Sequence, residues 1–511
     1  MDPVAVQSSR TGEELDIMIF NHKPQDRFST WDELLEYVRQ GAGVRTHSQQ
    51  VQPGDVFVAL PGTHTEGSDY IPQAVDRHAA WVVHPAHFKP GRTEARVRFL
   101  ACPDPGNALG ALAAAKYKTD HRKPFLVGIT GTNGKTTVSY LTEHLLRSAG
   151  KECGVLGTIN YRWKGREKHA DLTTPGCLEL HAMLAEMAED GVEVVCMEVS
   201  SHALDQQRTA GLAFDLAVFT NLTQDHLDYH QDMETYFQVK SRLFTTASWA
   251  SILNFDDKYG LRLAGLSRPG RGYSLNNVEV SDWPCLQGSV LQMERTGQVL
   301  GLHERRVGQW SLRSGLVGRH NASNLLAAQA IGLELGLGPH DFKALESCAG
   351  PPGRLQRVPN KHGLHVFVDY AHTPDALDNV LSALKELNFQ RLIVVFGCGG
   401  DRDPGKRPLM GQAVARHADL TVLTSDNPRH EDPEQIMQGV MPGLQGCRQV
   451  RRNPDRRQAI YMGLEATGPF DALVIAGKGH ECTQQIGDQK LLFSDVQVVR
   501  EYLDGLEVPG H

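Results

Sequence analysis

A glycine-rich turn at residues 128–137 constrains the fold of this chain more than any other feature. It follows an apolar run, Phe125 to Ile129, of the kind that forms a buried parallel strand. A helical pattern from Val138 to Ala149 comes next and ends at Gly150, a typical C-cap residue. Such a turn points backbone N–H groups and a helix N-terminus at one place, which suits a phosphate chain. Strand, turn and helix together predict an α/β domain with a phosphate site.

Two side chains give this turn a specific chemistry. Lys135 can neutralise the outer phosphates of a nucleotide, and the hydroxyl of Thr136 can bind the magnesium ion that accompanies them. The spacing departs from the common G-x-x-x-x-G-K-[ST] pattern, because Gly128 comes one residue early and Ile129 takes the expected glycine position. An ordinary glycine-rich turn is the alternative, but such a turn does not need the lysine. We therefore predict a site for a nucleoside triphosphate with Mg²⁺.

The length and composition argue against several classes of protein. A chain of 511 residues is too long for one hydrophobic core and favours about three domains. A net charge of −8 without a basic block argues against a nucleic-acid partner. Nine cysteines without a C-x-x-C pair argue against a disulfide framework or a zinc ribbon. Because we find neither a signal-peptide pattern nor an apolar run of roughly 18 residues, we expect a cytoplasmic enzyme without a membrane span.

Polar residues follow the apolar runs of this sequence where the predicted strands end, as Glu198 and Asp369 do. In open α/β sheets, ligands bind outside the carboxyl ends of the strands. We therefore predict an α/β fold with two doubly wound domains that share a cleft. Residues 122–349 would form a central P-loop ATPase domain, and residues 350–511 a C-terminal Rossmann-like domain. Residues 1–121 would form a small N-terminal α/β domain.

Two further side chains, Glu198 and His226, are candidate metal ligands, and a lysine lies close to the second of them in the sequence. Glu198 suits a magnesium ion at the P-loop because Mg²⁺ prefers hard oxygen ligands, but a strand-end carboxylate also caps helices. The segment from Asn221 to His230 is rich in imidazole and carboxylate groups, and His226 within it is a candidate metal ligand. Lys240 follows fourteen residues later, and by composition alone it is a solvated lysine on a helix.

Motifs between residues 131 and 481 resemble those of the Mur ligase family and occur in the family's order. They are Gly131-Thr132-Asn133-Gly134-Lys135-Thr136-Thr137, Glu198-Val199-Ser200-Ser201-His202, Asp225-His226-Leu227-Asp228, His320-Asn321-Ala322-Ser323-Asn324, Gly353-Arg354-Leu355-Gln356, Asp369-Tyr370-Ala371-His372-Thr373-Pro374-Asp375 and Gly477-Lys478-Gly479-His480-Glu481. The early glycine of the P-loop is the family's own pattern. A weaker match near Ser48 extends the resemblance into the first domain. Within the family, the chain most resembles the members that add meso-diaminopimelate.

The resemblance implies a nucleotide site and two magnesium ions. Lys240 falls where the family has a carbamylated lysine (N6-carboxylysine), which together with His226 would hold a second Mg²⁺. The first Mg²⁺ would be held by Thr136 and Glu198, and the catalytic residues would be Lys135, His226 and Lys240. The implied ATP contacts are Gly131, Thr132, Asn133, Gly134, Lys135, Thr136, Thr137, Asn321, Asn324, Arg354 and Asp369.

A second implied site binds a uridine-linked muramoyl dipeptide. Its residues would be Ser48, Thr63, His64, Thr65, Thr173, Thr174, Ser200, Gln206 and Arg208. The family often has Asp-Ser-Arg where this chain has His47-Ser48-Gln49, so the contacts to uridine are expected to differ in detail.

The motif Asp426-Asn427-Pro428-Arg429 bears on the choice of amino-acid substrate. It resembles the signature of the diaminopimelate-adding members, with Arg402, Gly477 and Glu481 completing the pocket. Diaminopimelate differs from lysine by a carboxylate at its far end, and a guanidinium group pairs with a carboxylate through two hydrogen bonds. Without the resemblance, Asn-Pro-Arg is typical of a plain turn.

The resemblance thus implies an ATP-dependent amide-bond ligase of peptidoglycan synthesis, and through it a role in cell shape and division. ATP would phosphorylate the D-glutamyl side-chain carboxylate of UDP-N-acetylmuramoyl-L-alanyl-D-glutamate, and the amine of meso-diaminopimelate would attack the acyl phosphate. We expect a monomer whose partners are these small molecules. Three rivals are a lysine-adding sister lacking Arg429, a folylpolyglutamate synthetase without need of the Ser48 region, and a P-loop regulator without the His226 and Lys240 pair.

Overall fold

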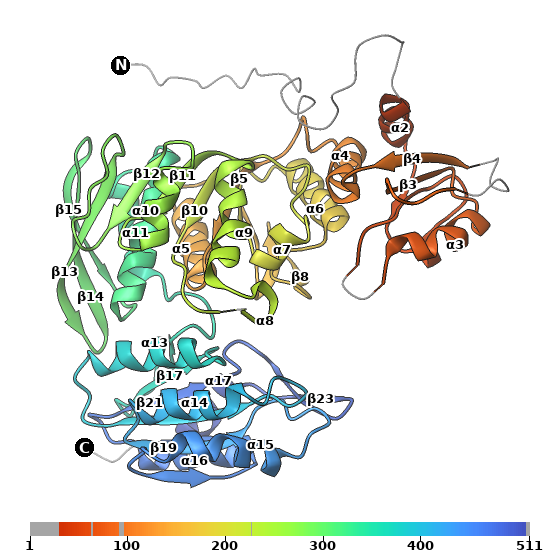
Figure 1. Cartoon of the computed structure of the whole chain (residues 1–511). Helices are drawn as coiled ribbons and strands as arrows, with labels where there is room; N and C mark the ends of the chain where they lie inside the picture. The colour runs from red at the N-terminus through yellow and green to blue at the C-terminus, as the bar shows by residue number, and fades with distance from the viewer. Residues whose placement is uncertain (1–29, 63–64, 91–96, 226, 507–511) are drawn as a thin grey trace. The chain divides into compact units, whose positions relative to one another are not determined.

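The computed structural model describes residues 30–62, 65–90, 97–225 and 227–506 of the chain. The described residues form two compact units, whose elements are labelled in Figure 1. The first unit is drawn from Met1–Phe125, Thr174–Glu193 and His202–Ala213, and the second from Leu126–Thr173, Val194–Ser201 and Phe214–His511. Among the described residues, no helix combines the length and the apolar character that crossing a membrane requires.

The first unit is built on a four-stranded parallel sheet in the order β1-β2-β3-β4. Its elements in chain order are α2 (Thr30–Arg39), β1 (Val44–Arg45), η1 (Ser48–Gln50), β2 (Val56–Val58), η2 (Gly67–Tyr70), α3 (Ile71–Asp76), β3 (Trp81–Pro85), β4 (Arg98–Cys102) and α4 (Pro105–Tyr117). Later in the chain, α6 (Cys177–Glu189) and most of α7 (Ser201–Asp205) join the same unit. Helices α4 and α6 pack side by side, as Figure 1 shows.

Helix α4 illustrates how local sequence sets an element in this unit. Asp104 is its N-cap and accepts a hydrogen bond from the N–H of Asn107 at 3.1 Å, while Pro105 occupies the first turn, where an N–H has no helical partner. Small residues then allow close packing. A Cβ on Gly110 would lie 2.3 Å from the carbonyl carbon of Ala210, so glycine is required where this helix meets the later segment.

The second unit contains an eleven-stranded sheet in the order β15-β14-β13-β12-β11-β10-β5-β9-β6-β7-β8. The strands are β5 (Phe125–Thr130), β6 (Cys153–Leu156), β7 (Asn160–Trp163), β8 (Arg166–His169), β9 (Val194–Glu198), β10 (Phe214–Phe219), β11 (Ser248–Asn254), β12 (Arg271–Ser274), β13 (Cys285–Glu294), β14 (Gly297–Glu304) and β15 (Gly308–Ser314). The central strands pair in parallel, and antiparallel hairpins extend both edges. The chain crosses from β9 to β10, on opposite sides of β5, so the P-loop lies at a switch in strand order, where ligands bind in such folds.

Helices of this part of the chain cover the sheet, and several of them share a hydrophobic core with its strands. They are α5 (Lys135–Ser148), α8 (Leu227–His230), α9 (Met233–Thr245), α10 (Lys258–Ala264), α11 (Arg319–Glu334), α12 (Pro339–Phe342) and η3 (Lys343–Ser347). Helix α5 begins at Lys135, three residues before the expected start at Val138, because Gly134 is the N-cap and the turn leads directly into the helix.

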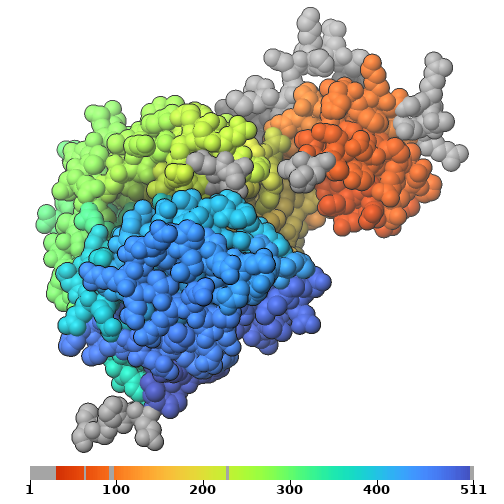
Figure 2. All heavy atoms as spheres, turned by 60° about the horizontal axis from the view of Figure 1, so that its bottom comes forward, coloured from red at the N-terminus to blue at the C-terminus, as the bar shows by residue number. Residues whose placement is uncertain are grey.

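The C-terminal part of the second unit, blue in Figure 2, has its own six-stranded sheet in the order β16-β17-β21-β18-β19-β20. All neighbours pair in parallel except β16. The elements are β16 (Gln356–Arg357), β17 (His365–Asp369), α13 (Pro374–Lys385), β18 (Leu392–Cys398), α14 (Lys406–Ala415), β19 (Leu420–Ser425), α15 (Pro433–Val440), η4 (Met441–Leu444), β20 (Val450–Arg452), α16 (Arg456–Ala466), β21 (Ala472–Ala476), the hairpin β22 (Thr483–Ile486) and β23 (Gln489–Leu492), and α17 (Asp495–Gly505). Two hydrophobic clusters surround this sheet, as expected for a doubly wound domain.

The predicted fold class is confirmed. The chain has a small N-terminal α/β sheet, a central P-loop sheet and a C-terminal Rossmann-like sheet. The main difference is that residues 174–193 and 202–213, placed by sequence in the central region, pack with the first unit.

Candidate functional site

A cavity of about 1330 Å³ in the second unit collects most of the side chains singled out in the sequence. It is lined by the P-loop, by the carboxyl ends of strands of the eleven-stranded sheet and by loops of the six-stranded sheet. The expected site residues on its wall are Thr132, Asn133, Gly134, Lys135, Thr136, Thr137, Thr173, Glu198, Ser200, Asn321, Asn324, Arg354, Asp369, Arg402, Asp426, Asn427, Arg429, Gly477 and Glu481. Gly131 and Pro428 belong to the same loops without lining the cavity.

The P-loop glycines are required by the backbone and by space. Gly131 has a φ of +147° and Gly134 a φ of +91°, a region that other residues rarely adopt. A Cβ on Gly131 would lie 1.9 Å from Oγ1 of Thr220, and one on Gly134 would lie 2.5 Å from Oδ1 of Asn324. The loop therefore packs tightly against Thr220, which follows strand β10, and against helix α11.

Lys135 lies over its own loop at the start of α5. Its Nζ donates hydrogen bonds to the carbonyl oxygens of Gly131 and Thr132, both at 2.9 Å. Burial lowers the pKa of Lys135, while the nearby carboxylate of Glu198 acts in the opposite direction. The ammonium group thus sits at the mouth of the loop, where the N–H groups of a P-loop meet a phosphate chain.

Glu198 joins the P-loop to the strand beside it. It is 1% exposed, and its Oε2 accepts hydrogen bonds from the hydroxyls of Thr136 and Thr158, each at 2.9 Å. The N–H of Thr158 donates to Oε1 at 3.1 Å. Carboxylate and hydroxyl oxygens gathered at a P-loop are ligands that Mg²⁺ prefers, so this donor set fits that ion. Sequence reasoning missed Thr158, which carries no motif.

Lys240 is buried, so its interpretation as a solvated helix lysine is wrong. It is 2% exposed on α9, and its Nζ lies 3.1 Å from the carbonyl oxygen of Gly131 and 3.3 Å from Oγ1 of Thr130. Burial is the main reason why its pKa lies well below the ordinary value, and the positive charge of Lys135 adds to the effect. His226 lies outside the described residues. No group of three or more His, Cys, Asp or Glu side chains suited to a metal occurs among the residues that are described.

The expected nucleotide residues come from both sheets of the second unit. Asn324 donates to Oδ1 of Asn321 at 3.2 Å on helix α11. The guanidinium of Arg354 lies 4.6 Å from the ring centre of Tyr370, and its buried Nε has no hydrogen-bond partner among the residues that the structure describes. Asp369 is buried at the end of β17 and accepts a hydrogen bond from the N–H of Ala371 at 2.7 Å. Burial raises the pKa of Asp369.

The Asp426–Arg429 motif follows β19 directly and shapes one wall of the cavity. The motif is not a plain turn: a turn begins only at Pro428, where the N–H of Glu431 donates to its carbonyl oxygen, and Arg429 forms an isolated β-bridge with Ile486. The side chains of Asp426, Asn427 and Arg429 line the cavity. Arg429 has a φ of +52° and donates through Nη1 to the carbonyl oxygen of Gly400 at 2.6 Å. The motif thereby holds the loop that carries Arg402. The amide of Asn427 donates to Oε2 of Glu481 at 3.0 Å.

The expected muramoyl-dipeptide residues are divided between the units. In the first unit, the guanidinium of Arg208 donates to Oε1 of Gln206 at 2.6 Å and to the carbonyl oxygen of Thr174 at 3.2 Å. The buried Ser48 donates its hydroxyl proton to Oε1 of Gln73 at 2.6 Å. In the second unit, the hydroxyl of Thr173 lies 3.2 Å from that of Thr158.

The remaining first-unit residue, Thr65, is exposed in the loop that precedes η2. Its expected partners in the same loop, Thr63 and His64, lie outside the described residues.

Comparisons with known proteins agree over nearly the whole chain. The Mur ligase middle domain matches residues 129–332, the glutamate ligase domain of Mur ligases matches residues 353–479, and the catalytic domain of the Mur ligase family matches residues 42–117. A UDP-N-acetylmuramoyl-L-alanyl-D-glutamate–2,6-diaminopimelate ligase of Lawsonia intracellularis is 51% identical over 459 residues, 89% of this chain and 95% of that protein. The ligase of the same name from Gloeobacter violaceus is 44% identical over 90% of this chain and 94% of that protein. A solved structure of an enzyme with this name has a TM-score of 0.66 at 34% identity and covers 90% of this chain and 94% of its own.

Proposed function

This chain belongs to the Mur ligase family, and on that premise we propose that it is an ATP-dependent ligase that adds meso-diaminopimelate to UDP-N-acetylmuramoyl-L-alanyl-D-glutamate. One observation carries the proposal: Lys135 of the P-loop and the Asp426–Arg429 motif line the same cavity. A ligase that consumes ATP to join an amino acid needs both groups within reach of one substrate.

The reaction has two steps. The γ-phosphoryl group of ATP is transferred to the D-glutamyl side-chain carboxylate, which gives an acyl phosphate and ADP. The amine of meso-diaminopimelate then attacks the acyl carbon, the amine loses a proton, and inorganic phosphate leaves as the amide bond forms. This chemistry needs positioning and charge neutralisation more than an enzyme nucleophile.

The P-loop supplies the neutralising charge. Its N–H groups and Lys135 bind the phosphates, and Asn321, Asn324, Arg354 and Asp369 bind the adenosine end of ATP. Thr136 and Glu198 would hold a magnesium ion, and the hydrogen bond that Thr158 donates to Glu198 fixes that carboxylate. When bound there, Mg²⁺ neutralises the charge that develops during phosphoryl transfer. The remaining nucleotide contacts are Gly131, Thr132, Asn133, Gly134 and Thr137.

Lys240 serves best as a carbamate. Its lowered pKa favours the neutral amine, and this amine is the form that reacts with CO₂, losing one proton to give R–NH–COO⁻. The product is an anion beside the P-loop, and with His226 it would hold a second Mg²⁺. A buried ammonium becomes a metal-binding group in this way.

The amino acid and the muramoyl dipeptide have separate sites. Arg429 and Arg402 pair with the far carboxylate of diaminopimelate, Asp426, Asn427, Gly477 and Glu481 complete the pocket, and Pro428 shapes the loop that carries them. The residues proposed for the dipeptide are Ser48, Thr63, His64, Thr65, Thr173, Thr174, Ser200, Gln206 and Arg208. The three proposed domains are residues 1–121, 122–349 and 350–511.

We place this ATP-consuming step in the cytoplasm, as part of cell-wall synthesis for cell division. We expect the protein to be a monomer.

One assay tests the proposal against its rivals. ADP release is measured with the uridine-linked dipeptide and either meso-diaminopimelate or lysine. We expect turnover that depends on the dipeptide and is much faster with meso-diaminopimelate. Faster turnover with lysine would favour the lysine-adding sister enzyme. Turnover with a folate substrate would favour the folylpolyglutamate synthetase, and the absence of any ligation would favour a P-loop regulator.

A further inference from the structure

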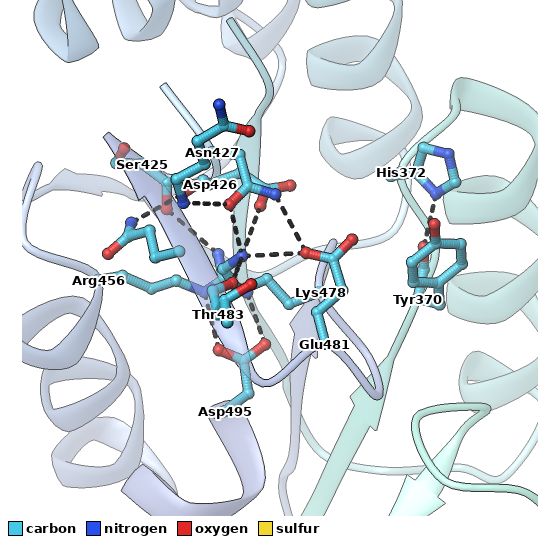
Figure 3. Close-up of polar contacts among 12 residues, drawn as sticks. Tyr370, His372, Ser425, Asp426, Asn427, Arg456, Lys478, Glu481, Thr483 and Asp495 are labelled. Atoms are coloured by element: carbon cyan, nitrogen blue, oxygen red, sulfur yellow. Dashed lines mark hydrogen bonds and ion pairs between the residues drawn. The ribbon is translucent and has the colours of Figure 1, made fainter. Parts of the chain in front are cut away.

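A buried lysine that the proposed reaction does not use lies beside the amino-acid pocket. Lys478 follows Gly477 at the end of β21 and is 0% exposed. Its Nζ donates to Oδ1 of Asn427 at 2.9 Å, to Oε2 of Glu481 at 3.1 Å and to the carbonyl oxygen of Thr483 at 2.7 Å, as Figure 3 shows. An ammonium group has three protons, so this geometry uses all of them.

These contacts fix the orientation of Asn427. Its Oδ1 accepts from Lys478 and also from the N–H of Gln485 at 2.9 Å, so its Nδ2 must point the other way. That Nδ2 donates to Oε2 of Glu481 at 3.0 Å. A side-chain amide held at both ends cannot flip, so Lys478 sets which group Asn427 presents to Glu481.

The same contacts leave one oxygen of Glu481 for a ligand. Lys478 and Asn427 both donate to Oε2, and within the described part of the chain Oε1 has no hydrogen-bond partner. Glu481 lines the cavity. A carboxylate held by one oxygen presents the other in a defined direction, which suits an incoming ammonium group.

Lys478 also separates two carboxylates on the pocket wall. Its Nζ lies 3.4 Å from Oδ1 of Asp426, which is 7% exposed, and this oxygen has no hydrogen bond within the described structure. Gly477, with a φ of +117°, leaves room for the carboxylate, because a Cβ there would lie 3.0 Å from Oδ2 of Asp426. Lys478 therefore offsets the charges of Asp426 and Glu481, and the buried Arg456 also interacts with both carboxylates.

We propose that Lys478 is a positioning residue for the amino-acid substrate: it orients Asn427 and Glu481 and balances Asp426, so that the free carboxylate oxygens receive an ammonium group while the arginines receive a carboxylate. The pocket is then complementary to the zwitterionic end of an α-amino acid. This inference rests on the proposed function, because it assigns the cavity wall to amino-acid binding.

The test compares Lys478→Met with Glu481→Gln and with the double variant. Lys478→Met should raise KM for meso-diaminopimelate about 10- to 100-fold, since charge-assisted hydrogen bonds to Glu481 and Asn427 are lost. KM for ATP should stay within about twofold in the same assay. If Lys478 acts through Glu481, KM for meso-diaminopimelate in the double variant should be close to the higher of the two KM values measured for the single variants.

Controls separate positioning from a purely structural role. Lys385→Met makes the same change on helix α13, where the exposed Nζ donates to the carbonyl oxygen of His417, and it should leave both KM values unchanged. If Lys478→Met does not fold, Lys478→Gln keeps donors at the site and is measured in its place. Fully multiplicative effects in the double variant, or an equal rise in KM for ATP, would overturn the proposal.

A structural readout keeps the inference independent of activity. In a crystal structure of the variant, the side chains of Asn427 and Glu481 should leave their present positions. If both stay in place, Lys478 does not position them, whatever the kinetics show. If instead the wild-type enzyme forms no ADP with meso-diaminopimelate, the proposed function fails, and the crystal structure still decides the role of Lys478.

Discussion

Lys240 combines burial with a strongly lowered pKa, and both follow from its place on α9 against the P-loop. Lys240→Ala should reduce ADP formation by about 100-fold or more, because the proposed carbamate beside the P-loop is lost. Short carboxylic acids added to the variant should restore part of the activity by standing in for the carbamate. Lys258→Ala on the neighbouring helix α10 is the matched control and should remain active. An unmodified Lys240 in high-resolution density from active enzyme would contradict the carbamate.

Arg429 tests how the amino acid is selected. Removing one partner of a buried charge pair costs about 2–5 kcal/mol, or roughly 30- to several-thousand-fold in binding. Arg429→Ala should therefore lose most of its activity with meso-diaminopimelate, chiefly through a higher KM. Lysine should be affected much less, because it has no far carboxylate. The measurement is the ratio of kcat/KM for the two amino acids. An unchanged ratio would indicate that Arg402, and not Arg429, binds the far carboxylate.

At the level of single residues, most of the side chains that the sequence predicted for the site line the cavity, but the sequence did not show their contacts. Motifs identified Glu198, whereas nothing in the sequence pointed to Thr158, because a lone threonine in a turn carries no pattern. Lys240 was misjudged from composition because a helix pattern does not tell which face meets the P-loop. Lys478 stood in a recognised motif, yet its three acceptors come from segments up to 51 residues away.

At the level of elements, the hairpin β22–β23 is tied to the amino-acid motif. The N–H of Arg429 donates to the carbonyl oxygen of Gln485 at 3.1 Å, and the N–H of Gly487 donates to that of Arg429 at 2.7 Å. His430 adds side-chain links to Asp401 at 2.9 Å and to Asp488 at 3.1 Å. The sequence predicted the strands that lead into this region but not the hairpin, because its contacts with the motif join distant parts of the chain.

His430 should make stability depend on pH. Its hydrogen bonds to Asp401 and then Asp488 raise its pKa, and the hydrogen bond to His430 lowers the pKa of Asp401. The folded state therefore binds the proton more tightly than the unfolded state, where the pKa is about 6.5. The stabilisation is fully present below that value and is lost as the pH rises through the raised pKa.

We expect His430→Ala to lower the melting temperature more at pH 6 than at pH 9. The pair is solvent-exposed, so high salt should reduce the difference. His340→Ala, an exposed histidine on α12, is the control and should show no such trend. Equal losses at both pH values would mean that the ion pairs do not stabilise the fold.

At the level of the whole molecule, the three sheets and their order could be predicted from alternating strand and helix patterns. The sequence could not predict which sheet each helix packs against. Helix α6 follows the P-loop region in sequence but packs with α4 of the first unit, and the later segment at Ala210 also packs against α4, at Gly110. Periodicity shows which face of a helix is apolar, and it does not show which sheet that face covers.

Nucleotide binding should stabilise both sheets of the second unit together, because the proposed ATP contacts come from the P-loop and α11 on one sheet and from Arg354 and Asp369 on the other. A ligand at 100 times its Kd adds about 2.7 kcal/mol to the free energy of unfolding. A non-hydrolysable ATP analogue with Mg²⁺ should therefore raise the melting temperature of the transitions of both sheets in calorimetry.

Lys135→Ala provides the variant for this measurement. It should fold, lose most of the thermal shift and form no measurable ADP, because the ammonium group at the mouth of the P-loop is gone. Lys151→Ala, just beyond the far end of the same helix, is the matched control and should keep both the shift and the activity. A full shift in Lys135→Ala would remove the P-loop from nucleotide binding. A shift confined to one of two transitions would instead mean that the nucleotide contacts a single sheet, and Arg354 and Asp369 would lose their assigned role.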